Sequence, residues 1–281
     1  MGKPSAILLC SKPGAAVALS ILVERGWDVR AVVPSALSRQ SWIAGETAVD
    51  LARDHGIPIV ERQSDLHGLP KADFVISYMY RYLVKPATLD LADRAAVNFH
   101  AGPLPEFGGW AFYNIAILED ADSYGCTCHH MDDGFDTGDL VHVRRFPINA
   151  SEETAVSLER RSQQEMIKLF ADFCELAESG QEIPKIPQDQ SRHRYMKQEE
   201  FQALKRIPAD SDDEQVQRYA RAFWYPPFEC AYIEMENAKA EVVPDCVKTE
   251  LATFHHIGDL DDLRQVAASY QPSISWALDS Q

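Results

Sequence analysis

Three polar residues, Asn98, His100 and Asp136, combine an amide donor, an imidazole and a carboxylate. These are the group types that move an acyl group onto an amine, because the amide suits a developing oxyanion and imidazole accepts protons near neutral pH. Asn98 and His100 lie two positions apart, so their side chains point the same way on an extended strand end. Asp136 follows His100 by 36 residues, enough for a helix and a further strand to return to the same sheet edge.

Each of these residues also has an ordinary structural explanation. Asn98 could form a turn at a strand end, and His100 could be a buried histidine with satisfied hydrogen bonds. Asp136 could shape a glycine-rich loop, as aspartates often do. A loop-forming role of this kind is a stronger alternative for Asp132, Asp133 and Asp139 than for Asp136. The surrounding sequence therefore has to decide.

That surrounding sequence resembles the 10-formyltetrahydrofolate-dependent formyltransferases, which carry Asn-x-His, then a Leu-Pro loop, then Gly-x-Asp-Thr-Gly-Asp at this separation. The matching segments are 98–105 (NFHAGPLP) and 131–139 (MDDGFDTGD), and 124–127 (YGCT) stands where the family has a Gly-x-Thr strand start. The motif Asn-Phe-His followed by Pro-Leu-Pro-Glu-Phe looks most like the sugar N-formyltransferases, as does the segment 221–227 (RAFWYPP). The resemblance is dense over about residues 73–145 and is not evident beyond 235.

The resemblance implies transfer of a formyl group from N10-formyltetrahydrofolate to the amino group of a nucleoside-diphosphate-linked amino sugar. Such an enzyme would act in surface-polysaccharide precursor synthesis, for example of the O-antigen of lipopolysaccharide. Asn98 would donate to the oxyanion, His100 would accept the amine proton, and Asp136 would support the charged imidazole. A formyltransferase acting on methionyl-tRNA or glycinamide ribonucleotide is the near alternative. A folate-binding regulatory protein with an inactive site is the distant one.

Further positions are implied as ligand contacts. Folate contacts are expected after the fourth strand and in the two motif loops: Met79, Tyr80, Arg81, Tyr82, Leu83, Leu104, Met131, Asp132, Asp133, Gly134 and Phe135. Tyr80 and Tyr82 are bulkier than the family pattern. Contacts to the sugar nucleotide are expected from aromatic, glycine and charged residues: Pro105, Glu106, Phe107, Gly109, Trp110, Tyr113, Arg192, Arg194, Trp224 and Tyr225. Arg81 and Lys85 are further candidates for the diphosphate. The aromatic residues could instead seat a helix on the sheet, and residues 192–197 could be a solvated linker.

Short apolar runs alternate with helical patterns over the first hundred residues. Strands are expected at 5–10, 27–33, 57–60, 73–77 and 95–99, with helices at 14–24 and 46–55. This alternation of strands and helices favours an α/β fold with a Rossmann-like parallel sheet covered by helices on both faces. Ligands bind at the carboxyl ends of such strands, where Asn98 and His100 fall. The turn at 11–14 has a single glycine, so no dinucleotide cofactor is predicted.

The second half of the chain predicts a smaller appended unit. A helix is expected at 111–119 and a long one at 154–179, capped by Ser151 and ended near Gly180. The proline-rich stretch 183–191 indicates a linker. Domains are therefore expected at 1–183 (catalytic) and 198–281 (a small α+β module), joined by 184–197. Within the module, a helix is expected at 213–223 and strands at 230–236 and 241–247.

The stretch from Cys126 to His130 contains two cysteines and two histidines and could suggest a metal site. On a strand, Cys126, Cys128 and His130 would share one face while Thr127 and His129 share the other. A structural zinc site draws a second ligand pair from elsewhere, and the other cysteines are solitary. We therefore expect strand residues and no metal.

The composition is that of an acidic globular enzyme. With 27 basic and 43 acidic residues the formal charge is −16, which argues against a general polyanion-binding surface and hence against nucleic acid. Residues 197–281 hold 8 Lys and Arg against 16 Asp and Glu. No stretch reaches the roughly 18 apolar residues of a membrane helix and no secretory pattern is present, which predicts a cytoplasmic protein. The aromatic residues near Trp224 make a homodimer plausible.

Overall fold

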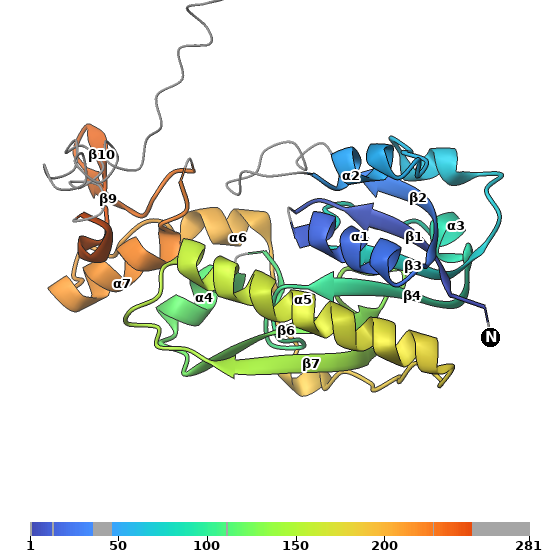
Figure 1. Cartoon of the computed structure of the whole chain (residues 1–281). Coiled ribbons are helices and arrows are strands. Elements are labelled where there is room, and N and C mark those ends of the chain that lie inside the picture. The colour runs from blue at the N-terminus through green and yellow to red at the C-terminus, as the bar shows by residue number, and fades with distance from the viewer. Residues whose placement is uncertain (1, 13, 36–46, 111, 227, 249–281) are drawn as a thin grey trace, which may run out of the picture.

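A six-stranded mixed sheet forms the centre of the computed structural model, which describes residues 2–12, 14–35, 47–110, 112–226 and 228–248 (Figure 1). The strand order is β2-β1-β3-β4-β6-β7. These strands are β1 (Ser5–Cys10), β2 (Asp28–Pro34), β3 (Ala72–Tyr78), β4 (Ala92–His100), β6 (Ser123–His130) and β7 (Leu140–Pro147). The first four are parallel, as the strand and helix alternation predicts, whereas β6 and β7 run antiparallel to their neighbours.

Helices and short strands surround this sheet. The helices are α1 (Gly14–Glu24), α2 (Ala48–Asp54), α3 (Pro86–Leu89), α4 (Phe112–Leu118), α5 (Ala155–Ser179), α6 (Gln198–Ala203) and α7 (Asp213–Phe223), with short 3₁₀ turns η2 (Gln63–Leu66) and η3 (Gln190–Arg192). The short strands are β5 (Gly108–Gly109), which pairs with β8 (Tyr195–Met196), and β9 (Tyr232–Met235), which pairs with β10 (Ala238–Glu241). The predicted strand at 57–60 is reduced to a bridge between Val32 and Ile59.

The two faces of the sheet are buried by different elements. α1 and α5 lie across one face and enclose the larger core (Figure 1), in which Val97 and Phe99 of β4 are fully buried. The opposite face is covered near β1 and β3 by a smaller apolar cluster that includes Leu66 and Val84. Because side chains alternate along a strand, Asn98 and His100 point away from the larger core.

Helix α5 confirms the predicted long helix but not its predicted cap. Thr154, rather than Ser151, is the N-cap: its hydroxyl accepts from the Ser157 amide, and the Ser157 hydroxyl accepts from the Thr154 amide. Ser151 instead donates to Asn149 in the preceding turn. Gly180 ends the helix in the left-handed conformation, as expected for a C-cap glycine.

Helix α7, from the predicted carboxyl-terminal module, packs on α4, where the Asn114 side chain donates to the Ala222 carbonyl at 2.6 Å. The predicted strand at 241–247 is wrong, because the second strand of this hairpin is β10 at Ala238–Glu241. Glu46, Ala111, Pro227 and residues 249–281, which belong to predicted elements, lie outside the described residues. No helix in the described part of the chain is long and apolar enough to cross a bilayer.

Candidate active site

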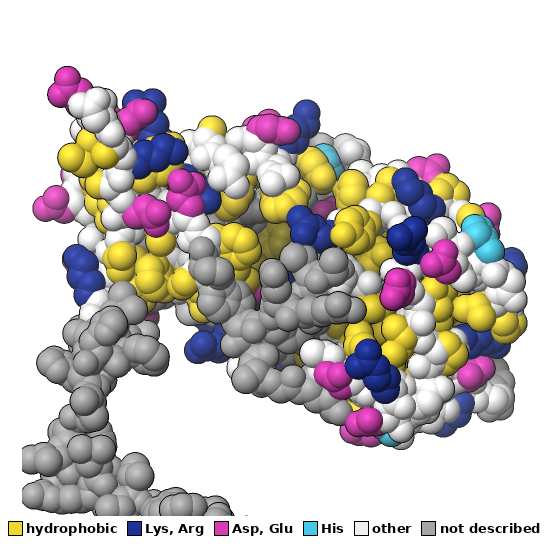
Figure 2. Space-filling model, turned by 90° about the horizontal axis from the view of Figure 1, so that it is seen from above, with side chains coloured by type: hydrophobic (Ala, Val, Ile, Leu, Met, Phe, Trp, Pro, Cys, Tyr) yellow, Lys and Arg dark blue, Asp and Glu magenta, His cyan; other side chains and the backbone are white. Residues whose placement is uncertain are grey.

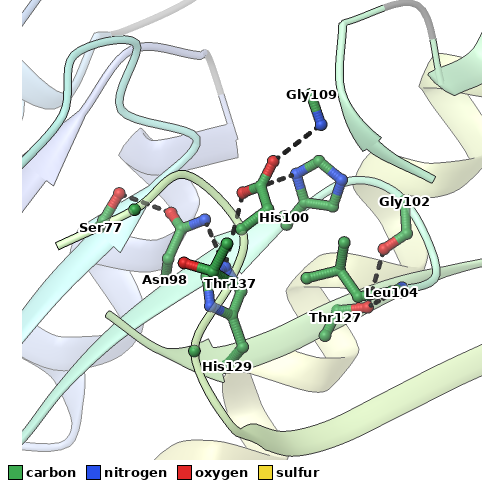
Figure 3. Close-up of polar contacts among 12 residues, drawn as sticks. Ser77, Asn98, His100, Gly102, Leu104, Gly109, Thr127, His129 and Thr137 are labelled. Carbon is green, nitrogen blue, oxygen red and sulfur yellow. Dashed lines mark hydrogen bonds and ion pairs between the residues drawn. The ribbon is translucent and has the colours of Figure 1, made fainter. Parts of the chain in front are cut away.

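Three neighbouring strands present a line of polar side chains at one end of the sheet. The register pairs Ser77 of β3 with Asn98 of β4, and Asn98 with His129 of β6. The Ser77 hydroxyl donates to Asn98 Oδ1 at 2.6 Å, and Asn98 Nδ2 lies 3.0 Å from His129 Nε2 (Figure 3). Asn98 is therefore held from both sides by its cross-strand neighbours.

The hydrogen bonds fix which groups around Asn98 donate. His129 Nδ1 lies 2.7 Å from the His130 carbonyl oxygen, which can only accept, so Nδ1 carries a hydrogen. In the neutral imidazole Nε2 is then the acceptor, and Asn98 Nδ2 donates to it. An amide nitrogen has two hydrogens. The second Nδ2–H of Asn98 is left for a ligand, since no described residue accepts it.

His100 is buried and oriented by a backbone carbonyl. Its Nε2 lies 2.7 Å from the Phe107 oxygen and therefore carries the hydrogen of the neutral ring. Its Nδ1 lies 3.6 Å from Asp136 Oδ1. The Phe112 ring meets the imidazole edge to face at 4.9 Å. His100 thus presents an unprotonated Nδ1 beside a carboxylate, which is the arrangement that a proton-accepting base requires.

Asp136 lies between the two imidazoles in a nearly buried position. Its Oδ1 is 3.6 Å from His129 Nε2 as well as from His100 Nδ1, and its Oδ2 accepts from the Gly109 amide at 2.9 Å. Burial alone would raise the pKa of Asp136, but His100, His129 and the Gly109 amide outweigh it and hold the pKa well below its usual range. Asp136 is therefore a carboxylate near neutral pH.

The loop that carries Asp136 is folded tightly on itself. The Asp132 carboxylate accepts from the Gly134 amide at 3.0 Å and from the Thr137 hydroxyl at 2.6 Å. Asp136 adopts a left-handed backbone conformation with φ of 58°, which aspartate tolerates better than most residues. A Cβ on Gly138 would lie 2.1 Å from the His130 carbonyl oxygen, so only glycine fits there.

The loop after β4 is fixed by Thr127, a neighbour of His129 on the same face of β6. The Thr127 hydroxyl donates to the Gly102 carbonyl at 2.8 Å and accepts from the Leu104 amide at 2.9 Å (Figure 3). A Cβ on Gly102 would lie 2.7 Å from the Phe107 oxygen and 2.9 Å from His100 Nε2. Gly102 therefore leaves the space in which the imidazole meets its carbonyl partner.

The structure brings Asn98, His100 and Asp136 into one cluster and adds His129, which the sequence analysis assigned only to a strand face. Its position, two residues after Thr127 and on the face that points to Asn98, is the signal that could have identified it. The cysteines of the same strand lie on the other face as predicted. Cys126 and Cys128 are buried in the larger core, and burial raises the pKa of the Cys126 thiol to about 12.

The residues predicted to contact folate lie after β3, after β4 and after β6. Met79 has φ of 52° and donates its amide to the Phe99 carbonyl at 3.1 Å. The Tyr80 and Tyr82 rings meet edge to face with centroids 5.5 Å apart, and Tyr82 is exposed. The remaining positions of this set divide into the half-buried or buried Leu83, Leu104 and Met131, and the exposed Arg81, Asp132, Asp133, Gly134 and Phe135.

The residues predicted to contact the acceptor are more scattered. Arg192 pairs with Glu106, and Arg194 pairs with Glu119. Tyr113 is buried in the core against Phe112 and Tyr124, which leaves its ring no surface for a ligand.

The other acceptor candidates divide by exposure. Trp110 is 40% exposed, whereas Pro105 is buried and Phe107 and Gly109 are half-buried. Trp224 and Tyr225 are half-buried where α7 ends, and the Tyr225 hydroxyl contacts Lys12 and Glu159. Trp110 is thus the most accessible aromatic side chain of this set.

Comparison with known proteins places the central part of the chain in a family. Residues 61–173 match the family described as formyl transferase. A methionyl-tRNA formyltransferase of Citrifermentans bemidjiense is 31% identical over 184 residues, which are 61% of this chain and 57% of that protein. A GDP-perosamine N-formyltransferase of Brucella melitensis is 28% identical over 173 residues, or 61% and 64% of the two chains. The chain thus aligns with less than two thirds of either relative.

The fold extends beyond that segment. The structure of an N-formyltransferase from Helicobacter canadensis, in complex with folinic acid and dTDP-3-aminofucose, superposes with a TM-score of 0.68 at 17% identity. The superposition covers 83% of this chain and 85% of the other. Residues 61–173 thus match the formyl transferase family, and the chain has the fold seen in the structure of that N-formyltransferase.

Proposed function

We propose that this chain transfers the formyl group of N10-formyltetrahydrofolate to the amino group of a sugar linked to a nucleoside diphosphate. The observation that carries the proposal is the convergence of Asn98, His100 and Asp136 where β4 ends. Ligands of open α/β sheets bind outside the carboxyl ends of the strands, which is where this cluster lies.

The geometry supports a simple reaction path. As the neutral amine attacks the formyl carbon, negative charge develops on the formyl oxygen, and the second Nδ2–H of Asn98 can donate to it. His100 Nδ1 accepts the proton that the amine loses, directly or through one water, and Asp136 stabilises the resulting imidazolium. The bond between the formyl carbon and N10 then breaks, and tetrahydrofolate leaves as N10 takes up a proton.

The donor assignment rests on the family match and on the surroundings of the site. The Helicobacter canadensis relative was crystallised with folinic acid, a folate that carries a formyl group. In this chain the Tyr80 and Tyr82 rings and the exposed Phe135 offer flat apolar surface beside the backbone groups of two loops. A pterin requires that combination of apolar contact and in-plane hydrogen bonding.

A nucleotide-linked sugar is the proposed acceptor because charge disfavours a nucleic acid. Lys and Arg are interspersed with Asp and Glu on the face seen in Figure 2, where the described side chains form no continuous basic stretch. RNA binding requires such a stretch, and the whole chain carries −16. A diphosphate needs only local cations. Arg81 and Lys85 are exposed and have no ion-pair partner among the described residues, so we place the diphosphate near them.

Methionyl-tRNA is the second candidate acceptor, because a methionyl-tRNA formyltransferase is among the similar sequences. The similarity covers 57% of that protein and does not decide the acceptor. The sugar acceptor is favoured by the name of the Brucella melitensis relative and by the ligand of the Helicobacter canadensis structure.

The proposal is tested by incubating the chain with N10-formyltetrahydrofolate and a panel of amino-sugar nucleotides. We expect release of tetrahydrofolate that depends on one of these amines, together with a formylated sugar nucleotide detected by mass spectrometry. A reaction without the chain provides the background rate. Absence of amine-dependent release with every member of a panel varied in base, sugar and amine position would refute the sugar assignment.

A further inference from the structure

The proline-rich segment between the two domains is bonded to both loops of the candidate active site. We call residues 184–196 the strap. Its Pro184 carbonyl lies 2.9 Å from His130 Nε2, and Ile186 exchanges two backbone hydrogen bonds with Leu140 at 2.7 and 2.9 Å. The first half of the strap therefore runs beside the chain that enters and leaves the Asp136 loop.

The second half of the strap holds the other loop. The Arg194 amide donates to the Pro105 carbonyl at 3.0 Å, and the Arg194 carbonyl accepts from the Gly108 amide at 3.1 Å. Met196 of β8 accepts from the Trp110 amide at 2.9 Å. This half therefore fixes the backbone on both sides of Gly109, whose amide donates to Asp136.

Gln188 is the one strap residue whose side chain bonds to the loop of the catalytic carboxylate. It is buried, and its Nε2 donates to the Asp136 carbonyl and to the Gly138 carbonyl, each at 2.8 Å. The two carbonyls determine the orientation of the amide, because a flipped amide would set its oxygen against two other acceptors. Both donors of Gln188 are thus used on this loop.

The Gln188 hydrogen bonds hold the Asp136 loop in a backbone conformation that its residues do not favour on their own. The Asp136 backbone is left-handed, with φ of 58°. Gln188 donates to the carbonyl of Asp136 itself and to the carbonyl of Gly138, two residues later. Such a conformation persists where surrounding contacts determine it. The carboxylate must remain 3.6 Å from His100 Nδ1 to support the imidazolium, so a shift of the loop would weaken the base.

We infer that Gln188 is a positioning residue for Asp136, and that the strap couples the Asp136 loop to the loop containing Gly109. This inference rests on the proposed formyl transfer. Gln188 then acts only through the Asp136 carboxylate. Both of its donors bond to the loop, so removing them should weaken stabilisation of the transition state without changing the affinity for the acceptor.

The first test is the variant Gln188→Met, which removes both donors while keeping a side chain of similar volume. We expect kcat for formyl transfer to fall about 10- to 100-fold, with the acceptor KM and the Tm nearly unchanged. Gln190→Met is the matched control, because Gln190 is exposed, lies two residues along the strap and has no bond to either loop. An unchanged kcat in Gln188→Met would overturn the inference.

A double-mutant cycle separates positioning from general support of the fold. In the Asp136→Asn background the carboxylate is already lost, so Gln188→Met should then cost less than about threefold in kcat. An equal loss in both backgrounds would show that Gln188 does not act through Asp136.

Hydrogen exchange gives a readout that does not depend on activity. Amides of residues 134–139 should exchange faster in Gln188→Met than in the wild type or in Gln190→Met. If the wild type forms no formylated product, the proposed function fails, and this exchange alone decides whether Gln188 holds the loop. Equal exchange in the three proteins would contradict the inference.

Discussion

Asn98 shows how a single amide can be oriented by its neighbours and still keep a donor free. The Ser77 hydroxyl donates to the amide oxygen of Asn98, and the amide nitrogen donates one hydrogen bond to His129. These two bonds fix the orientation of the amide, and with it the direction of the remaining N–H. Preorganised donors of this kind stabilise a developing oxyanion without reorganising during the reaction.

Removing the Asn98 amide donor should weaken stabilisation of the transition state. Asn98→Ala should lower kcat on the order of a hundredfold or more, since one oxyanion donor is commonly worth about 3 to 4 kcal/mol. Steady-state kinetics with both substrates measures the effect, with the exposed Asn237→Ala as control. An effect confined to KM would mean that Asn98 binds substrate and does not stabilise the oxyanion.

The imidazole of His100 should be required for proton transfer rather than for binding. His100→Asn removes the base and should lower kcat by at least about a hundredfold, while the KM for folate changes little. His67→Asn, at an exposed histidine, is the control. Full activity of His100→Asn would exclude the proposed path.

The lowered pKa of Asp136 predicts a pH-dependent contribution to stability. A carboxyl with a depressed pKa in the fold stabilises it above its ordinary pKa of about 3.9, and this contribution is lost as the pH falls through the lower folded value. The difference in unfolding free energy between the wild type and Asp136→Asn should therefore shrink below about pH 4. Urea titrations at several pH values measure it, and Asp133→Asn, at an exposed site, should show no such trend.

At the scale of elements, the site depends on where three strands and two loops end. The apolar runs predict the strands that carry Asn98 and His100, because short buried strands between helical patterns are a local signal. The reversed direction of β6 between β4 and β7 carries no such signal. It is this reversal that places His129 beside Asn98.

The N-cap of α5 and the contacts of Gln188 could not be predicted from the sequence either, because both depend on particular hydrogen bonds and not on local propensity. Ser151 and Thr154 are both plausible caps, and only the reciprocal bonds with Ser157 select Thr154. Gln188 falls in a stretch whose prolines indicate a linker, yet its side chain donates to two carbonyls about 50 residues away in the chain. Local propensity predicts elements, whereas contacts between distant segments complete the site.

The loop after β4 offers a test at this scale. In Gly102→Ala the new methyl group would press on the Phe107 carbonyl and on His100 Nε2, at 2.7 and 2.9 Å. We expect the hydrogen bond that orients the imidazole to be disturbed and kcat to fall about tenfold or more, with the fold retained by circular dichroism. Gly2→Ala, where nothing lies within 4 Å, is the control. Wild-type kcat in Gly102→Ala would mean that this contact does not orient the base.

Over the whole molecule, net charge is the property that we expect to distinguish the possible acceptors. The proposed catalytic cluster of Asn98, His100 and Asp136 would suit formyl transfer onto any amine, so it does not distinguish a sugar from a ribonucleotide or a tRNA. The acidic module and the interspersed surface charge disfavour an RNA, whereas a sugar nucleotide needs only a few local contacts (Figure 2).

The most direct test is therefore a comparison of acceptors under one set of conditions. Formyl transfer from N10-formyltetrahydrofolate is followed with the amino-sugar nucleotide panel, with methionyl-tRNA and with glycinamide ribonucleotide, and kcat/KM is determined for each. We expect the highest kcat/KM for an amino-sugar nucleotide, and loss of that activity in His100→Asn. A higher kcat/KM for methionyl-tRNA or glycinamide ribonucleotide would contradict it.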